Sequence, residues 1–304
     1  MQSQSWTGCF IPLITPFRED FSIDEAGLRR LVHYYIEEVG CDGLVPCGTT
    51  GESPTLDPRE HARVIEIVVA ETRRRVPVIA GTGSNSTRAA IEMTKQCEDA
   101  GADASLQVCP YYNRPTQDGL LRHFEAVAAA TSLPIFVYNI PSRTGRLIEA
   151  ATMAALSRID NIVGMKDACG DLMVTMEIIR ATRENPKKFH VLCGEDALTL
   201  PMMALGGDGG ILAVAHVVGK EYREMIRKYL SGNVQEAREI HFRTLPVVQA
   251  LFLETNPVPV KEALAMMDLP AGRVRLPLAP LRPENRERLR AVLKASGYLG
   301  NGIG

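Results

Sequence analysis

The chain has 304 residues, of which 45% are hydrophobic and 23% charged, and its formal net charge at pH 7 is -2. This length suits one α/β barrel of about 250 residues with an extension, and the hydrophobic fraction is sufficient for a large core. The near-neutral charge and the lack of a basic run argue against a partner made of nucleic acid, so we expect small-molecule ligands.

The cysteine content predicts a reducing, cytoplasmic location. There are seven cysteines, an odd number, and no CxxC pair occurs. Such a set is typical of small buried hydrophobes in a cytosolic protein and not of a disulfide framework. The polar start, Met1 to Trp6, does not resemble a signal peptide, and no apolar run approaches the ~20 residues needed to span a bilayer. We therefore expect no membrane partner.

From the N-terminus onward, short apolar runs alternate with longer amphipathic stretches, which predicts βα units and a parallel sheet. Eight such units indicate a closed (β/α)8 TIM barrel. A doubly wound sheet is the alternative, but no GxGxxG follows the first strand. We expect strands at residues 10–14, 43–47, 76–80, 105–109, 134–138, 162–166, 190–193 and 210–214, and helices at 25–39, 58–73, 87–100, 117–130, 148–158, 171–183 and 196–205, with a last barrel helix beyond 218.

Helix-end signals support this division. Residues 57–60 read Asp-Pro-Arg-Glu, a capping box with proline at the first helical position, and Gly40 suits a left-handed C-terminal cap. Residues 219–304 carry no convincing strand, and helices are expected at 219–230, 233–251, 258–267 and 284–296. We accordingly predict a catalytic barrel domain at residues 1–220 and a C-terminal helical subdomain at residues 221–304, packed beside the barrel.

Lys166 is the first candidate catalytic residue, because active sites of such barrels lie at the carboxyl ends of the strands. It ends the run Ile162 to Lys166, where a period of two places Ile162, Gly164 and Lys166 on one face, toward the barrel mouth. Gly164 would leave space beneath the lysine. Burial favours the free amine that attacks a carbonyl. A lysine that simply extends to solvent is the alternative.

Tyr138 ends the preceding predicted strand, so its phenol could lie beside Lys166 and carry protons. An aromatic wall of the core is the alternative role. After the second strand, Thr49 and Thr50 lie in the loop Gly48–Ser53, where hydroxyls and free amides make a plausible carboxylate cradle. An ordinary Gly/Thr turn would have the same composition.

Arg143 follows Tyr138 in a loop over the barrel mouth and could bind a carboxylate through two hydrogen bonds, although a solvated arginine is the alternative. The six histidines form no HxxxH or HExxH, and no Cys/His cluster has zinc spacing, so we predict no metal. No GxSxG is present, which argues against a serine hydrolase.

Three motifs together carry a family resemblance: Gly48–Ser53, Tyr138–Gly145 and Gly164–Asp167. In this order, over a region from Gly8 to about Leu281, the chain resembles the dihydrodipicolinate synthase/N-acetylneuraminate lyase family. Within that family, the segments 110–115 and 256–261, together with Arg143, resemble the synthase branch.

The resemblance implies a Schiff-base mechanism without a separate cofactor. Lys166 would form an imine with pyruvate, whose carboxylate Thr49 and Thr50 would hold. The resulting enamine would condense with L-aspartate 4-semialdehyde, bound through its carboxylate by Arg143. The product would be 4-hydroxy-tetrahydrodipicolinate, and the reaction would be the first committed step of the diaminopimelate route to lysine.

Further site residues and an assembly follow from the same resemblance. Tyr138, Thr49 and Tyr112 would form a proton relay, with Tyr112 reaching in from a neighbouring subunit. Backbone groups of Gly194 and Ile211 would line the imine pocket. The expected assembly is a homotetramer, built as a dimer of dimers.

Many family members bind L-lysine as a feedback inhibitor, and four matching positions here keep suitable residues: Ser53, His61, Asn85 and Tyr111. Two other positions differ from lysine-sensitive relatives, with Pro58 in place of a histidine and Ala89 in place of a glutamate. We therefore expect weak lysine inhibition or none.

Two alternative functions remain open from the sequence. The first is another pyruvate-dependent aldolase or lyase of the family, acting on sialic acid or a 2-keto-3-deoxy sugar acid. The second is a catalytically inactive barrel that serves as a binding or scaffolding protein.

Overall fold

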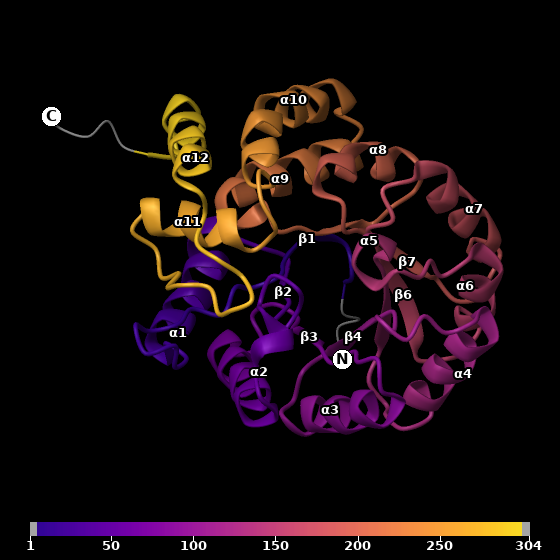
Figure 1. Ribbon diagram of the computed structural model, residues 1–304. Coiled ribbons are helices and arrows are strands. Elements are labelled where there is room, and N and C mark those ends of the chain that lie inside the picture. Colours follow the sequence, from indigo (N-terminus) through magenta and orange to yellow (C-terminus); the bar gives the residue numbers. More distant parts are fainter. Residues whose placement is uncertain (1–4, 300–304) are drawn as a thin grey trace, which may run out of the picture.

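Eight parallel strands form one sheet in the order β2-β1-β8-β7-β6-β5-β4-β3 (Figure 1). The computed structural model describes residues 5–299, and a single parallel bridge between Leu44 and Val78 joins the two outer strands. The sheet therefore closes into the predicted barrel. Its strands are β1 (Gly8–Ile11), β2 (Gly43–Leu44), β3 (Ile79–Gly81), β4 (Ala104–Val108), β5 (Ile135–Asn139), β6 (Ile162–Asp167), β7 (His190–Cys193) and β8 (Gly209–Ile211).

Strands β1 and β2 end earlier than the apolar runs that predicted them. Pro12 follows β1 and Pro46 lies inside the second run, and proline has no N–H to donate to a ladder. The barrel contacts nevertheless continue, because the Gly81 N–H donates to the Pro46 carbonyl at 2.9 Å. The early ends release the loops that follow toward the mouth of the barrel.

Helices form a ring around the barrel, and most follow the predicted ranges (Figure 1). The capping box of Asp57 and Glu60 is confirmed, and Gly40 has the predicted left-handed conformation, with φ +72°. The first predicted helix ends as a π-helix over Tyr34–Val39. The barrel helices are α1 (Glu25–His33), α2 (Pro58–Thr72), α3 (Thr87–Asp99), α4 (Gln117–Ala128), α6 (Ala150–Leu156), α7 (Leu172–Thr182), α8 (Thr199–Ala204) and α9 (Ala215–Leu230).

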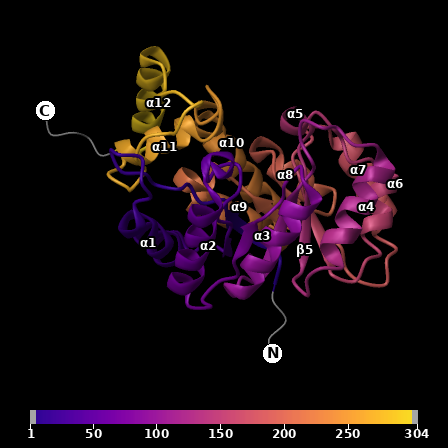
Figure 2. The same ribbon diagram turned by 60° about the horizontal axis from the view of Figure 1, so that its bottom comes forward.

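The C-terminal helices lie beside the barrel, as Figure 2 shows for α11 and α12. These helices are α10 (Val234–Ala250), α11 (Val258–Met266) and α12 (Pro283–Ala295). Helix α10 packs against α9 and α12, and α11 packs against α9 and α12. The predicted domain boundary at residue 220 falls within α9 and stays a prediction. Residues 1–4 and 300–304 of the predicted domains lie outside the described residues.

Two separate apolar clusters make up the core. The larger one lies between the strands and the helices, and it includes Ile11, Met165 and Leu212. The smaller one fills the barrel interior; in it Trp6 lies edge-on to Phe136, with ring centroids 5.3 Å apart. Inward and outward side chains alternate along each strand, which is how a barrel fills both spaces.

The predicted phase of β6 is correct at its end and wrong at its start. The pairing of β5 with β6 shifts by one residue between Ile135 and Phe136. Because of this irregularity, Ile162 packs in the outer cluster and Val163 against the inner one, opposite to the prediction. Met165 packs in the outer cluster, and Lys166 faces the barrel mouth as predicted.

Among residues 5–299, no helix is long and apolar enough to cross a membrane.

Candidate active site

Lys166 and Tyr138 lie side by side at the carboxyl ends of neighbouring strands, as predicted. They are direct partners in the register of β6 and β5, and the Lys166 Nζ lies 4.4 Å from the centroid of the Tyr138 ring. Lys166 is only 6% exposed and Tyr138 only 4%. A buried amine against a phenol ring is thus placed where this fold locates its chemistry.

Gly194, in the loop after β7, makes the room that Lys166 occupies. A Cβ atom on Gly194 would lie 2.5 Å from the Lys166 Cε and 2.9 Å from its Cγ. The predicted space beneath the lysine at Gly164 is wrong, because β7 and the Phe136 ring fill it: a Cβ on Gly164 would lie 2.5 Å from the His190 carbonyl oxygen and 2.7 Å from the Phe136 Cε1. Ile211, at the end of β8, is fully buried in the inner cluster.

A cavity of about 390 Å³ is lined by Tyr138, while Lys166 lies behind the Tyr138 ring and is not part of the lining. Its wall includes Tyr138, Thr49 and Arg143, three of the predicted site residues, together with Tyr111 and Asn256. Apolar side chains such as Leu106 and Ile140 complete the lining. The cavity therefore offers a small apolar space with a few converging polar groups, as expected of a binding site for a small molecule.

Hydrogen bonds fix the Gly48–Ser53 loop and orient its threonine hydroxyls. The Thr15 hydroxyl donates to the Gly51 carbonyl at 2.7 Å, and the Asn256 amide donates to the Thr50 hydroxyl oxygen at 2.9 Å. Thr50 is buried, whereas Thr49 lines the cavity. Because the Thr50 oxygen accepts from Asn256, its own O–H is free to donate to an anion.

Arg143 lies in α5 (Pro141–Thr144), a single helical turn where the sequence predicted a loop. One of its guanidinium nitrogens, Nη2, donates to the Asn256 carbonyl at 3.2 Å. The side chain lines the cavity, and its other N–H groups can bind a planar carboxylate. The structure confirms the predicted position of Arg143 over the barrel mouth, and the role of Arg143 in substrate binding stays a prediction.

Tyr112 does not line the cavity of its own chain. Its side chain is 90% exposed and its backbone has φ +69°, whereas the neighbouring Tyr111 lines the cavity. A bulky residue with positive φ is uncommon and indicates a constrained loop. The predicted proton relay through Tyr112 therefore requires that this residue be supplied by a partner subunit.

The four residues matched to a lysine site come from four separate segments of the chain. Ser53 and Tyr111 line the cavity, and the backbone carbonyl of Asn85 accepts a hydrogen bond from the Asn113 side chain at 2.8 Å. His61 is buried in α2, and its Nε2 donates to the Gly81 carbonyl at 2.8 Å. Burial lowers the pKa of His61, which keeps the ring neutral in this role.

Two buried carboxylates lie at the ends of the strands near Lys166, and only that of Asp196 interacts with the Lys166 charge. Burial raises the pKa of Asp196 to about 7, while the Val214 amide and the Lys166 charge act in the opposite direction. Burial also raises the pKa of Asp167, next to Lys166 in β6, against the hydrogen bond from the Thr175 hydroxyl. The predicted site did not include these groups, because only burial in the folded chain distinguishes them from ordinary acidic residues.

Sequence reasoning also gave no role to Glu52, Lys261 and Asn256. Lys261 lies in the helix Val258–Met266, whose other buried residues are all apolar, and it is 2% exposed. A lysine on the apolar face of a helix is a signal that could have marked it, because lysine is rarely buried without a partner. Across residues 5–299, no group of three or more His, Cys, Asp or Glu residues could hold a metal ion.

A larger groove of about 640 Å³ lies elsewhere, along α9 near Val39, which precedes β2. Its lining is dominated by charged side chains such as Lys220, Arg223 and Arg227. The groove lies at the amino-terminal ends of the strands, opposite to Lys166. In this fold that face contributes to stability and does not carry the active site.

Comparisons with known proteins agree with this geometry. The family model of the Dihydrodipicolinate synthetase family matches residues 5–296. A 4-hydroxy-tetrahydrodipicolinate synthase of Methanothrix thermoacetophila is 51% identical over 295 residues, which cover 97% of this chain and 98% of that protein.

Two solved structures share the fold over nearly their whole length. A chloride-inhibited dihydrodipicolinate synthase of Acinetobacter baumannii, complexed with pyruvate, is 41% identical with a TM-score of 0.93, covering 97% of this chain and 100% of that one. A monomeric dihydrodipicolinate synthase variant is 38% identical with a TM-score of 0.94, covering 96% and 97%. The chain belongs to the dihydrodipicolinate synthetase family.

Proposed function

We propose that this protein is a 4-hydroxy-tetrahydrodipicolinate synthase, a lyase that condenses pyruvate with L-aspartate 4-semialdehyde. The observation that carries the proposal is the placement of the buried Lys166 amine against the ring of Tyr138, which lines a cavity together with Arg143. The names of full-length relatives that are about half identical support the same activity. The reaction would serve the diaminopimelate route to lysine.

The first half of the reaction attaches pyruvate to the enzyme. The neutral Lys166 amine adds to the keto carbon, and loss of water gives an iminium, while Thr49 and Thr50 hold the carboxylate. The Tyr138 phenol, next to the amine, transfers the protons that the addition and the loss of water require. Loss of a methyl proton then gives an enamine, with the iminium as the electron sink.

The second half forms the new carbon–carbon bond. The enamine carbon attacks the aldehyde carbon of the semialdehyde, and the aldehyde oxygen takes up a proton to become a hydroxyl. The substrate's amino group then adds to the iminium carbon and displaces the Lys166 nitrogen, which closes the ring and frees the enzyme. Arg143 orients the semialdehyde through its carboxylate, so that only an acidic aldehyde is placed correctly.

Assembly and location form part of the same proposal. Tyr112 projects from the chain with 90% of its side chain exposed, which suits a residue that reaches into a neighbouring subunit. We infer a homotetramer, a dimer of dimers, in the cytoplasm. No separate cofactor is needed, because the imine on Lys166 supplies the electron sink. The replacements at Pro58 and Ala89 support weak lysine inhibition or none, and strong inhibition by micromolar lysine would contradict this.

Borohydride trapping tests the nucleophile. Incubation of the protein with pyruvate and borohydride should give a single adduct that peptide mass mapping places on Lys166, and the Lys166→Met variant should give none. A wild-type protein without this adduct would refute the Schiff-base mechanism and favour an inactive scaffolding barrel.

Aldehyde specificity separates the synthase from other pyruvate aldolases of the family. A coupled assay should give turnover with L-aspartate 4-semialdehyde and little with sugar aldehydes. Arg143→Ala should lose this turnover and still form the pyruvate imine, whereas Arg122→Ala, on the exposed face of α4, should behave as wild type. Normal turnover by Arg143→Ala would show that the assigned role is wrong.

A further inference from the structure

The Glu52 carboxylate, two residues beyond Thr50, is almost completely buried and is held from a distant part of the chain. Its Oε1 forms an ion pair with the Lys261 Nζ at 2.5 Å, with the two side chains 1% and 3% exposed. Its Oε2 accepts a hydrogen bond from the Arg275 backbone N–H at 2.9 Å. Both oxygens of this loop residue therefore bind to the C-terminal region.

The backbone of the loop depends on this anchoring. Glu52 has φ +54°, a left-handed conformation that a side chain other than glycine adopts only under constraint. The preceding Gly51 has no room for a side chain, since a Cβ there would lie 2.9 Å from the Leu13 carbonyl oxygen. The loop that carries Thr49 and Thr50 is thus fitted tightly, and its conformation follows the position of the Glu52 carboxylate.

Helix α11 and the residue just before its N-cap supply two of the loop's supports. Asn256, which donates to the Thr50 hydroxyl, lies just before α11, and Lys261 lies within α11. The Lys261 ammonium also donates to the Arg273 carbonyl at 2.9 Å and lies 4.3 Å from the centroid of the Phe17 ring. A displacement of α11 would therefore move the partners of Thr50 and Glu52 together.

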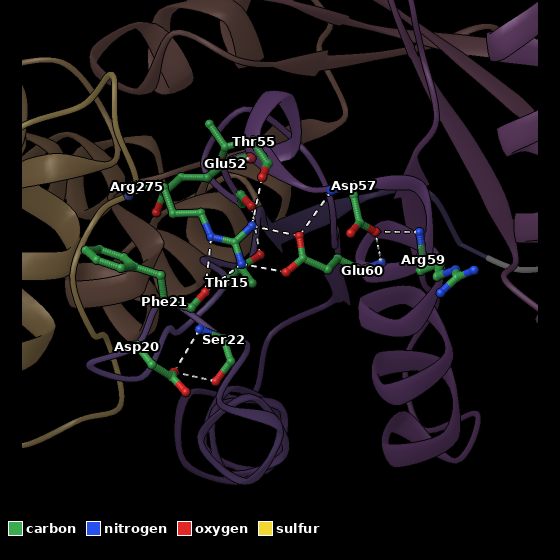
Figure 3. Close-up of polar contacts among 11 residues, drawn as sticks. Thr15, Asp20, Phe21, Ser22, Glu52, Thr55, Asp57, Arg59, Glu60 and Arg275 are labelled. Carbon is green, nitrogen blue, oxygen red and sulfur yellow. Dashed lines mark hydrogen bonds and ion pairs between the residues drawn. The ribbon is translucent and has the colours of Figure 1, made fainter.

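Arg275 extends the support to the helix after the loop (Figure 3). Its guanidinium binds both oxygens of Glu60, in the first turn of α2, at 2.5 and 2.7 Å. It also donates to the Thr55 carbonyl at 2.7 Å and lies 4.1 Å above the Phe17 ring. Figure 3 shows this arginine between the loop residues Glu52 and Thr55 on one side and Glu60 on the other.

We propose that Glu52, Lys261 and Arg275 are positioning residues, through which the C-terminal helices set the conformation of the Thr49–Thr50 loop that receives the carboxylate of the 2-keto acid. This role rests on the proposed function, since it assumes that the loop binds pyruvate. None of the three residues acts on the reacting atoms.

The environment of Lys261 accords with such a role. Burial lowers the pKa of Lys261 to about 8, the Glu52 carboxylate opposes this effect, and the Arg275 charge adds to it. The groups that face the ammonium are these two, the Phe17 ring and the Arg273 carbonyl. A neutral residue in place of either partner leaves the other charge buried and unpaired, which strongly destabilises the folded state.

Substitutions that remove one charge at a time test the proposal. Lys261→Met and Glu52→Gln should each raise the KM for pyruvate about tenfold and leave kcat within about threefold, because Lys166 lies on a different element. The KM of the double variant should be closer to the wild-type KM than that of either single variant, because no unpaired buried charge remains in it. Glu262→Gln is the matched control: it neutralises the next residue of α11, which pairs with Arg286 on the outer side.

Hydrogen exchange of the ligand-free protein supplies a readout independent of catalysis. Amides of residues 48–55 should exchange faster in Lys261→Met than in wild type and at the wild-type rate in Glu262→Gln. If the wild-type protein fails to trap pyruvate, the proposed function is wrong, while faster exchange still supports control of the loop by α11.

Other outcomes would overturn the positioning role. Unchanged exchange and an unchanged KM in Lys261→Met would remove it altogether. A loss of kcat with a constant KM would show that the ion pair acts on the chemical step and not on the carboxylate loop.

Discussion

The candidate site has two parts, which we call its two walls: the Lys166–Tyr138 pair and the Thr49–Thr50 loop. The two walls are supported in different ways. Lys166 and Tyr138 stand on β6 and β5, whose backbone ladder fixes their spacing, and the next pair, Asn139 and Asp167, continues that ladder. Thr49 and Thr50 stand on a loop whose shape depends on two side chains and one backbone N–H from residues 256–275.

This difference indicates a division of labour within one site. Lys166 is held by a strand of the rigid barrel, and neighbouring residues such as Gly194 affect only the room around its side chain. A loop places the anion-binding hydroxyls, and because a separate helical region holds it, its geometry can be altered without change to the barrel. Substitutions on the two walls should therefore have distinct effects on stability, on kcat and on KM.

The largest effect is expected for the ion pair that supports the loop. Lys261→Met should lower the free energy of unfolding by about 3–5 kcal/mol, because it leaves the Glu52 carboxylate buried without its partner. Urea denaturation of Lys261→Met, Glu52→Gln and the double variant measures this loss and the coupling energy. Losses that simply add would contradict a direct interaction between the two side chains.

A smaller effect, confined to the nucleophile wall, is expected for Gly194→Ala. The new methyl group would occupy the space of the Lys166 side chain, 2.5 Å from its Cε, and displace the amine. A displacement of about 1 Å lowers kcat on the order of 10²-fold. Steady-state kinetics should show this loss with little change in the KM for pyruvate, and a wild-type kcat would show that Lys166 has another productive position.

The smallest effect concerns pH and the end of β1. His216 accepts from the Ile14 N–H at 3.2 Å and, through Nδ1, donates to the Ala213 carbonyl at 2.8 Å, so it must be neutral. Burial lowers its pKa to about 4 in the folded protein, below the ordinary value near 6.5 of an unfolded chain. The unfolded state therefore binds more protons between these values, and stability falls as the pH falls through this window.

At pH 5 this single histidine should cost about 2 kcal/mol relative to pH 7. The measurement is the difference in unfolding free energy between pH 7 and pH 5, for wild type and for His216→Gln. The variant should lose about 2 kcal/mol less than wild type over this range. An equal loss in both proteins would mean that other groups account for the acid sensitivity.

The same contrast explains what the sequence could and could not predict. Period-two alternation and strand order placed Lys166 beside Tyr138, because both are properties of local sequence and of the barrel. The partners of the loop could not be found in this way: Asn256 lies 206 residues from Thr50, and no local pattern encodes that contact. The register shift at Ile135 was likewise invisible, since a bulge depends on how two strands pair and not on either alone.

The inner cluster contains a residue whose fluorescence can report on the packing of the barrel interior. Trp6 is the sole tryptophan of the chain, and it lies buried against Phe136 inside the barrel. Its fluorescence should follow the packing of the barrel interior, whereas far-ultraviolet circular dichroism follows mainly the surrounding helices. Recording both signals during denaturation would reveal whether the interior and the helical ring unfold together.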